Sequence, residues 1–299
     1  MWETALAFAI WGSYGTVLTV AHIDPALTAI ARSAGLGILL TTASVAITRL
    51  RGRREITAAI PWRSGALWLS GSVLLVDEVL YSVSAVSGPV AIIGLAYGCV
   101  PILAPLLSRL AGTDRGEAMR ARHWACLALA FIGNAVVFSE LQAARIHFTI
   151  AAALAFVSGL LFTLMPVCSA RLQQDGLGTW AVLKGQAAVA SILAVPLLAL
   201  LIGLGIVRLG GDGHAAIVRR SVEMGAVNAV AFTLTPFYLW YRGIGRCGVA
   251  RTSICAFAEP LVATVFSLLV LKDAPSTPLL VAGAALVLFA IAAATRSGE

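Results

Sequence analysis

Five ionisable side chains interrupt long apolar stretches of the chain: Arg32, Asp77, Glu78, Lys184 and Glu259. Placing such a group in bilayer hydrocarbon costs at least about 2.5–3.5 kcal/mol, so it persists where it pairs, lines water or takes part in function. Two bases and three acids leave one negative charge in excess. The sequence therefore predicts a charged site within the apolar part of the molecule.

Asp77 and Glu78 are adjacent, so a helix points their side chains about 100° apart. Ser70, Asp77, Tyr81 and Ser84 recur at spacings of seven, four and three residues and share one helical face. We expect this face to line a cavity, with Asp77 in the solute path and Glu78 paired with a neighbouring helix. The alternative is that neighbouring helices satisfy both carboxylates.

Glu259 lies beside Pro260 in an apolar stretch, and the corresponding position of an earlier stretch is Val100-Pro101. A proline frees a backbone carbonyl one turn back, which a membrane helix tolerates only against protein or a water-filled cavity. We expect hinges at Pro101 and Pro260. For Glu259 two roles stay open, an ion pair between packed helices and a titrating site.

The two buried bases have competing interpretations as well. Arg32 lies roughly 10 Å along its stretch at about 1.5 Å per residue, too deep to reach the headgroups easily. Arg32 and Lys184 could neutralise the carboxylates or bind a carboxylate of a substrate. An ion-pair partner is the more frequent role for Arg32, and Lys184 is near enough to the end of its stretch to snorkel to the interface.

Aromatic residues of these stretches are candidates for the walls of a binding site. Tyr81 and Trp240 are 159 residues apart, the same spacing as the two hinge prolines. Such rings would hold an apolar or cationic solute by stacking or cation–π contact. Trp2 and Tyr241 are expected in the interfacial belt instead. The predicted solute site comprises Trp11, Tyr14, Asp77, Tyr81, Tyr97, Phe237, Tyr238, Trp240 and Glu259.

Elements that position these residues must be helices that cross a membrane. Of 299 residues, 60% are apolar and 12% charged, against about 45–50% and 25% in soluble domains. This composition excludes a soluble α/β enzyme and a protein with a single anchor. Asp24 before Pro25 predicts one helix start. The ten predicted spans are 4–21, 25–47, 65–86, 89–110, 123–139, 147–169, 178–205, 221–243, 248–271 and 276–295.

The net charge of +7 lies in short loops between the apolar runs, so it predicts topology and no nucleic-acid surface. Most basic residues, among them Arg53, Arg54, Arg115 and Arg120, fall on the side of the termini, so both termini are predicted to be cytoplasmic. The cysteines form no Cys-x-x-Cys pair and the histidines lie at span ends or in loops. We expect no metal site, disulfide framework or cofactor.

The chain repeats a pattern in its two halves. Gly88-Pro89-Val90-Ala91 leading to Pro101 recurs as Cys247-Gly248-Val249-Ala250 leading to Pro260, 159 residues later. Five spans per half is an odd number, so the second copy must enter the membrane in the opposite orientation. The predicted fold is all-α and polytopic, with inverted five-helix repeats at 1–142 and 143–299, an architecture typical of transporters.

The sequence resembles the EamA-type branch of the drug/metabolite transporter superfamily. The resemblance rests on Trp11-Gly12-Ser13, on Arg32, on the segment from Pro101 to Ser108, and most strongly on 258–263 (AEPLVA) leading into 269–273 (LVLKD). It implies ten helices in two inverted repeats, a central cavity lined mainly by the first, third, fourth, sixth, eighth and ninth spans, and export or exchange of small organic solutes. The family often ends its fourth and ninth spans in Leu-Gly-Glu, where this chain has Leu107-Ser108-Arg109 and Leu271-Lys272-Asp273.

These observations predict a secondary transporter of the bacterial inner membrane, not an enzyme, that exports amino acids or related small metabolites by alternating access. No ATPase signature is visible, and the surplus carboxylate points to protons as a coupling ion. The expected partners are a small solute, protons and the lipid bilayer, with the chain a monomer or a homodimer. A multidrug exporter for lipophilic cations is the alternative. An integral-membrane enzyme is less favoured, because the polar residues lie at mid-depth instead of at the interface.

Overall fold

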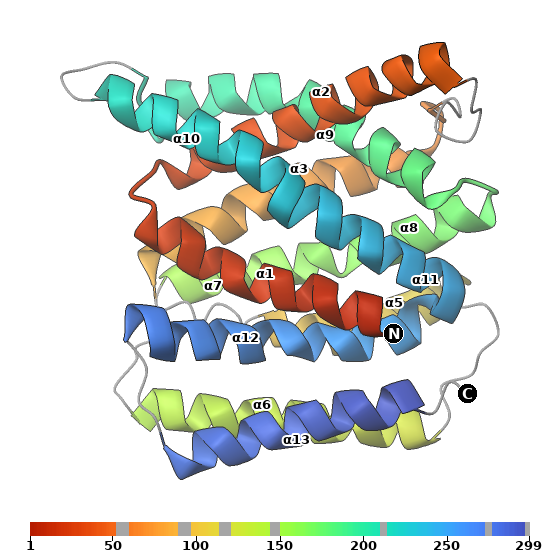
Figure 1. Cartoon of the computed structure of the whole chain (residues 1–299), viewed down its shortest axis with the longest axis vertical. Coiled ribbons are helices and arrows are strands. Elements are labelled where there is room, and N and C mark those ends of the chain that lie inside the picture. The colour runs from red at the N-terminus through yellow and green to blue at the C-terminus, as the bar shows by residue number, and fades with distance from the viewer. Residues whose placement is uncertain are drawn as a thin grey trace.

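The computed structural model describes residues 1–51, 60–88, 97–113, 121–143, 150–209, 214–272 and 277–296. Within these ranges every regular element is helical, as the sequence predicts (Figure 1). A helix satisfies its own backbone hydrogen bonds, which an apolar chain in lipid requires because no water is present to do so. Lying outside the described residues are the repeat positions Pro89, Val90 and Ala91, the loop arginines Arg53, Arg54, Arg115 and Arg120, and Asp273.

The first part of the chain forms α1 (Trp2–Val20), α2 (Pro25–Arg51), α3 (Gly65–Ser87), the 3₁₀ turn η2 (Tyr97–Cys99), α5 (Val100–Leu110) and α6 (Ala121–Ala143). The second part forms α7 (Ile150–Phe162), α8 (Leu164–Gln174), α9 (Thr179–Gly203), α10 (His214–Asn228), the π-helical η3 (Ala229–Leu234), α11 (Thr235–Ile254), the 3₁₀ turn η4 (Cys255–Phe257), α12 (Ala258–Phe266), the π-helical η5 (Ser267–Leu271) and α13 (Pro278–Arg296).

Local signals in the sequence account for several of these boundaries. The Oδ1 atom of Asp24 accepts a hydrogen bond of 2.8 Å from the Leu27 N–H, which confirms the predicted helix start. Gly248 has φ 76° and ψ 169°, so it breaks the run of α11 at the start of the predicted ninth span. Only glycine adopts such a conformation readily.

Five helical segments are long and apolar enough to cross a membrane, judged by length and composition. They make this an all-helical, membrane-embedded protein. The segments are Pro25–Ala46, Gly65–Ser87, Ile150–Gln174, Thr179–Gly203 and His214–Leu271. The last contains 58 residues, more than the about 20 that one crossing needs. Val100–Leu110 and Val281–Ala293 are shorter apolar helices.

The helices pack so that α1 and α3 reach the middle of the molecule (Figure 1). α1 contacts α12, α11 and α3, while α3 contacts α7, α8 and α9. α2 packs on α9 and α10, and α6 pairs with α13 at one end of the long axis (Figure 1). The first residues of α1 and the last turns of α13 lie on the same side of the molecule (Figure 1).

Gly12 lets α1 approach α12 at the depth of the Glu259-Pro260 pair. A Cβ atom on Gly12 would lie 2.5 Å from the backbone oxygen of Glu259 and 2.8 Å from the Cβ of Val262. Real Cβ atoms do not approach backbone this closely, so the contact requires glycine. This gives a physical reason for the glycine of the Trp11-Gly12-Ser13 motif.

Gly12→Ala should therefore lower the free energy of unfolding by about 1–3 kcal/mol through overpacking. Gly203→Ala is the matched control, because a Cβ on this helical glycine would have no neighbour within 4 Å. Thermal or denaturant unfolding of both variants in detergent measures the difference. If both substitutions had the same effect, the inferred contact between α1 and α12 would be wrong.

Candidate functional site

A small cavity lies where α1, α2, α3, η2, α7, α11 and α12 meet. It is lined by Trp11, Tyr14, Arg32, Asp77, Glu78, Tyr81, Tyr97, Phe162, Phe237 and Glu259. Each of these side chains is at most 7% exposed. The space open to water is about 30 Å³, room for roughly two water molecules. Four ionisable groups therefore share an almost dry site walled by aromatic rings.

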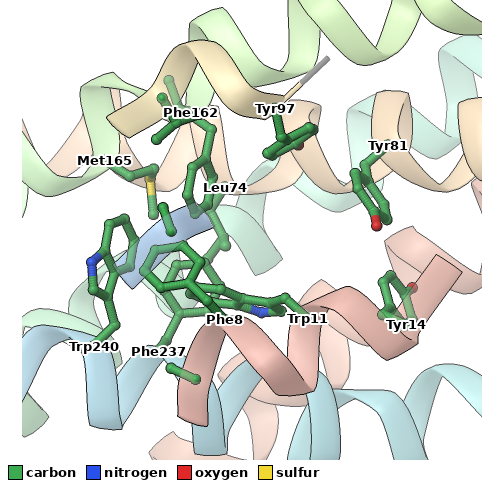
Figure 2. Close-up of a cluster of buried hydrophobic side chains, with 14 of the residues drawn as sticks. Phe8, Trp11, Tyr14, Leu74, Tyr81, Tyr97, Phe162, Met165, Phe237 and Trp240 are labelled. Carbon is green, nitrogen blue, oxygen red and sulfur yellow. The ribbon is translucent and has the colours of Figure 1, made fainter. Parts of the chain in front are cut away.

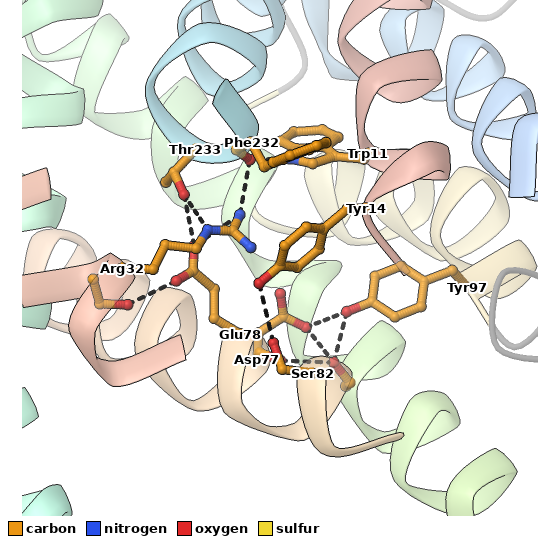
Figure 3. Close-up of polar contacts among 11 residues, drawn as sticks. Trp11, Tyr14, Arg32, Asp77, Glu78, Ser82, Tyr97, Phe232 and Thr233 are labelled. Atoms are coloured by element: carbon orange, nitrogen blue, oxygen red, sulfur yellow. Dashed lines mark hydrogen bonds and ion pairs between the residues drawn. The ribbon is translucent and has the colours of Figure 1, made fainter. Parts of the chain in front are cut away.

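Arg32 and Glu78 form an ion pair inside this site, with Nη2 3.1 Å from Oε1 (Figure 3). Glu78 also accepts hydrogen bonds from Ser33 Oγ (2.7 Å) and from Thr233 Oγ1 (3.3 Å). Arg32 Nε donates to Thr233 Oγ1, and the Arg32 Cζ lies 4.3 Å from the centroid of the Tyr14 ring. The pair links α2, α3 and η3, and its two charges cancel.

The backbone carbonyl of Phe232 is a second anchor for the same guanidinium. It accepts a hydrogen bond of 2.8 Å from Arg32 Nη2 and another of 2.8 Å from Trp11 Nε1 (Figure 3). One carbonyl oxygen has two lone pairs and can accept both. α1 and α2 are thus joined through a single backbone atom of η3.

Asp77 is held differently, by two hydroxyl groups (Figure 3). Its Oδ1 accepts hydrogen bonds of 2.5 Å from Tyr97 Oη and 2.5 Å from Ser158 Oγ, and these two hydroxyls lie 2.6 Å apart. Ser158 is therefore shared between Asp77 and Tyr97. The triangle joins α3, η2 and α7, but it brings no positive charge to Asp77.

Glu259 has no hydrogen-bond or ion-pair partner among the described residues, although it is only 4% exposed. The hydroxyl of Tyr81, which lines the same cavity, is also buried without a partner in the described part of the chain. A carboxylate and a hydroxyl that lack partners in one dry cavity are suited to a ligand that donates hydrogen bonds or carries positive charge.

Aromatic rings form one continuous cluster that includes several residues of the cavity lining (Figure 2). Tyr14 stacks on Tyr81 with centroids 5.9 Å apart, and Tyr81 meets Tyr97 edge-on at 5.1 Å. Trp11 meets Phe237 edge-on at 4.8 Å and Phe162 at 5.7 Å. Rings packed in this way expose their faces or edges to the cavity and exclude water from it.

Some predicted site residues lie outside the cavity lining. Trp240 packs behind it, stacked on Phe162 at 5.1 Å, at the opposite end of the cluster from Tyr14 and Tyr81 (Figure 2). Tyr238 is half-buried against Trp180 instead, with centroids 4.7 Å apart. Lys184, in α9, is likewise absent from the lining.

The interfacial position predicted for Tyr241 is wrong. The side chain is fully buried, and its hydroxyl donates a hydrogen bond of 2.6 Å to Gln186 Oε1. Gln186 supplies the polar partner that the interface would otherwise provide. Trp2, at 70% exposed, lies at the surface.

Both predicted hinge prolines are buried and follow a short 3₁₀ turn. η2 precedes the helix that contains Pro101, and η4 precedes the helix that contains Pro260. The tighter turn marks a change of backbone geometry at each place.

Sequence reasoning missed several partners of the site: Ser33, Ser158, Phe162, Phe232 and Thr233. Ser33 adjoins Arg32, but a serine in an apolar helix usually bonds its own backbone and so gives no distinct signal. Phe162 is one apolar residue among many. Their roles depend on which helices become neighbours.

Comparison with known proteins identifies a shared fold. No model of a protein family matches the chain, and no curated protein matches it. The chain is similar to a solved structure described only as "Crystal structure of protein", with a TM-score of 0.70 and 20% sequence identity over 99% of this chain and 96% of that one. This likeness shows that the helical fold is shared. It says nothing about substrate.

Removing one member of the buried ion pair should lower the free energy of unfolding. Glu78→Gln leaves the Arg32 guanidinium without its counter-charge, and we expect a loss of about 3–5 kcal/mol in unfolding free energy. The double variant Arg32→Gln/Glu78→Gln should recover part of this loss, which a double-mutant cycle in detergent measures.

The matched control for this cycle is Glu223→Gln, which breaks the exposed pair of Arg219 and Glu223, whose side chains are 75% and 65% exposed. That change should cost no more than about 1 kcal/mol. Equal effects of Glu78→Gln and Glu223→Gln would refute a structural role for the buried pair.

Proposed function

We propose that this protein is a secondary transporter of the EamA type, within the drug/metabolite transporter superfamily. It exports small solutes that carry an ammonium group, above all amino acids and related metabolites, across the bacterial inner membrane in exchange for protons. One observation carries the proposal: Asp77 and Glu259 are buried in one aromatic cavity, and among the described residues neither forms an ion pair.

The balance of charge supports a cationic ligand. Arg32 is already neutralised by Glu78 at 3.1 Å, so Asp77 and Glu259 are the two acids left over. An isolated carboxylate is far too costly to keep ionised in a dry site. Each must therefore hold a proton or face a positive group. If protons and an ammonium group compete for the same carboxylates, binding of one releases the other. Such a site couples the movement of protons to the movement of the solute.

Helix packing supports ten spans in two inverted repeats. If α1 of the first half corresponds to α7–α8 of the second, the contact of α1 with α11 has a counterpart in that of α7 with α3. The same relation makes α9 the counterpart of α2 and α13 the counterpart of α6, and the two members of each pair are in contact. Such reciprocal contacts are expected of two repeats related by a two-fold axis in the membrane plane. The α1 start and the α13 end lie on the same side of the molecule, as an even number of spans requires (Figure 1).

The size of the cavity supports alternating access. Pockets that bind small organic solutes measure about 300–1,000 Å³, ten or more times the 30 Å³ found here. The cavity must widen to admit a solute. The changes of helix geometry next to Pro101 and Pro260 are suitable places for that motion.

Lipophilic cations are a second candidate class of solute. Arg32 is engaged by Glu78 and by the Phe232 carbonyl, which limits its capacity for the carboxylate of an amino acid. Stacked and edge-on rings of Tyr14, Tyr81 and Tyr97 would suit a large cation.

Competition in proteoliposomes separates the two classes. Uptake of a labelled amino acid should be inhibited by other amino acids and much less by aromatic cationic dyes. The reverse order would replace the first solute class by the second.

Glu259→Gln and Asp77→Asn should each reduce transport driven by a pH gradient at least about tenfold, the equivalent of 1.4 kcal/mol of lost interaction. Solute affinity of the unaltered protein should fall as the pH falls, because protonation removes the charge that holds the ammonium group. In Glu259→Gln this pH dependence should flatten. Transport assays at several pH values measure both effects.

Glu223→Gln serves again as the control, since its exposed carboxylate should leave transport unchanged. Undiminished gradient-driven transport in both Glu259→Gln and Asp77→Asn would remove the proposal.

A further inference from the structure

α10, η3 and α11 form one continuous helical segment, and its backbone hydrogen-bond pattern changes beside the cavity. In an α-helix the N–H of residue 236 would bond to the carbonyl of residue 232. Position 236 is a proline, which has no N–H. The π-helical turn η3 ends two residues before it, and Pro236 itself is buried. The Phe232 carbonyl therefore lacks the N–H donor that a regular α-helix would supply.

Two side chains from other helices take the place of that donor. Trp11 Nε1 of α1 and Arg32 Nη2 of α2 each donate a hydrogen bond of 2.8 Å to the Phe232 oxygen. Both residues line the cavity. The adjacent Thr233 bonds to Arg32 and to Glu78, so the same turn also holds the ion pair (Figure 3).

We propose that Pro236 is a positioning residue of the solute site, because its missing N–H leaves the Phe232 carbonyl open to orient Trp11 and Arg32. The effect on solute binding rests on the proposed function; the effect on the geometry of Trp11 and Arg32 does not. An amide N–H at position 236 would compete for the carbonyl and would release one or both side chains into the cavity.

The experiment must separate the missing N–H from the packing of the proline ring. Pro236→Ala removes the ring and adds an N–H. Replacing Pro236 by lactic acid removes the ring in the same way but puts an ester oxygen where the N–H would be. Pro196→Ala is the matched control, because Pro196 is also inside a helix, in α9, and is exposed.

The direct measurement is the indole N–H resonance of Trp11 in ¹H–¹⁵N spectra of the protein in nanodiscs, assigned with Trp11→Phe. Pro236→Ala should shift this resonance, while the lactic-acid variant and Pro196→Ala should leave it in place. Solute affinity, measured on the same samples, should fall about tenfold in Pro236→Ala alone, the loss expected for one hydrogen bond to a charged group.

Each result decides the matter. Equal shifts in the alanine and lactic-acid variants would assign the effect to the ring and overturn the proposal, as would an unshifted resonance in Pro236→Ala. If Pro236→Ala fails to fold while the lactic-acid variant folds, the N–H is the damaging group and the proposal stands. If both fail to fold, the ring is required and the proposal falls. If no solute binds the unaltered protein, the proposed function fails while the resonance still tests Pro236.

Discussion

The charged side chain of Arg32, only 3% exposed within a bundle of apolar helices, constrains the residues packed around it. Arg32 stays charged in any protein environment, so the fold must supply a counter-charge and acceptors for its N–H groups. Glu78 supplies the charge, and the π-helical turn η3 supplies the Phe232 carbonyl and the Thr233 hydroxyl. These contacts fix α2 against α3 and η3. Through Trp11, which shares the same carbonyl, they also fix α1.

The three carboxylates of the cavity differ in how many ion-pair and hydrogen-bond partners they have, and this difference suits them to different roles. Glu78 has a full ion pair and two hydroxyl donors. Among the described residues, Asp77 has the hydroxyls of Tyr97 and Ser158 as partners but forms no ion pair. Glu259 has neither, among the residues that the structure places. A group that the protein satisfies completely is structural, whereas a buried group left unsatisfied has capacity for a proton or a ligand.

Irregular backbone is concentrated where helices reach the cavity. η3 and η4 interrupt long helical segments that contribute to the site, and η2 contributes Tyr97 to it, whereas α6, α9 and α13 are continuous and contribute no residue to the lining. Interrupted helices leave carbonyls without helical partners, which is tolerable in a membrane only against protein or water. The same interruptions give the chain places to bend. Binding geometry and capacity for motion therefore come from the same feature of the backbone.

The sequence alone determined the helical class, the buried charges and the separate faces of Asp77 and Glu78, because lipid forces the backbone into helices and a helix fixes the angle between neighbours. Tertiary structure decided that Arg32 pairs with Glu78, that Ser158 and Tyr97 hold Asp77, and that Tyr241 is buried while Tyr238 and Trp240 lie outside the lining. The physical reason is that lipid tails are as apolar as a protein interior. A membrane helix can therefore be apolar on every face, and its sequence does not reveal which face meets which neighbour.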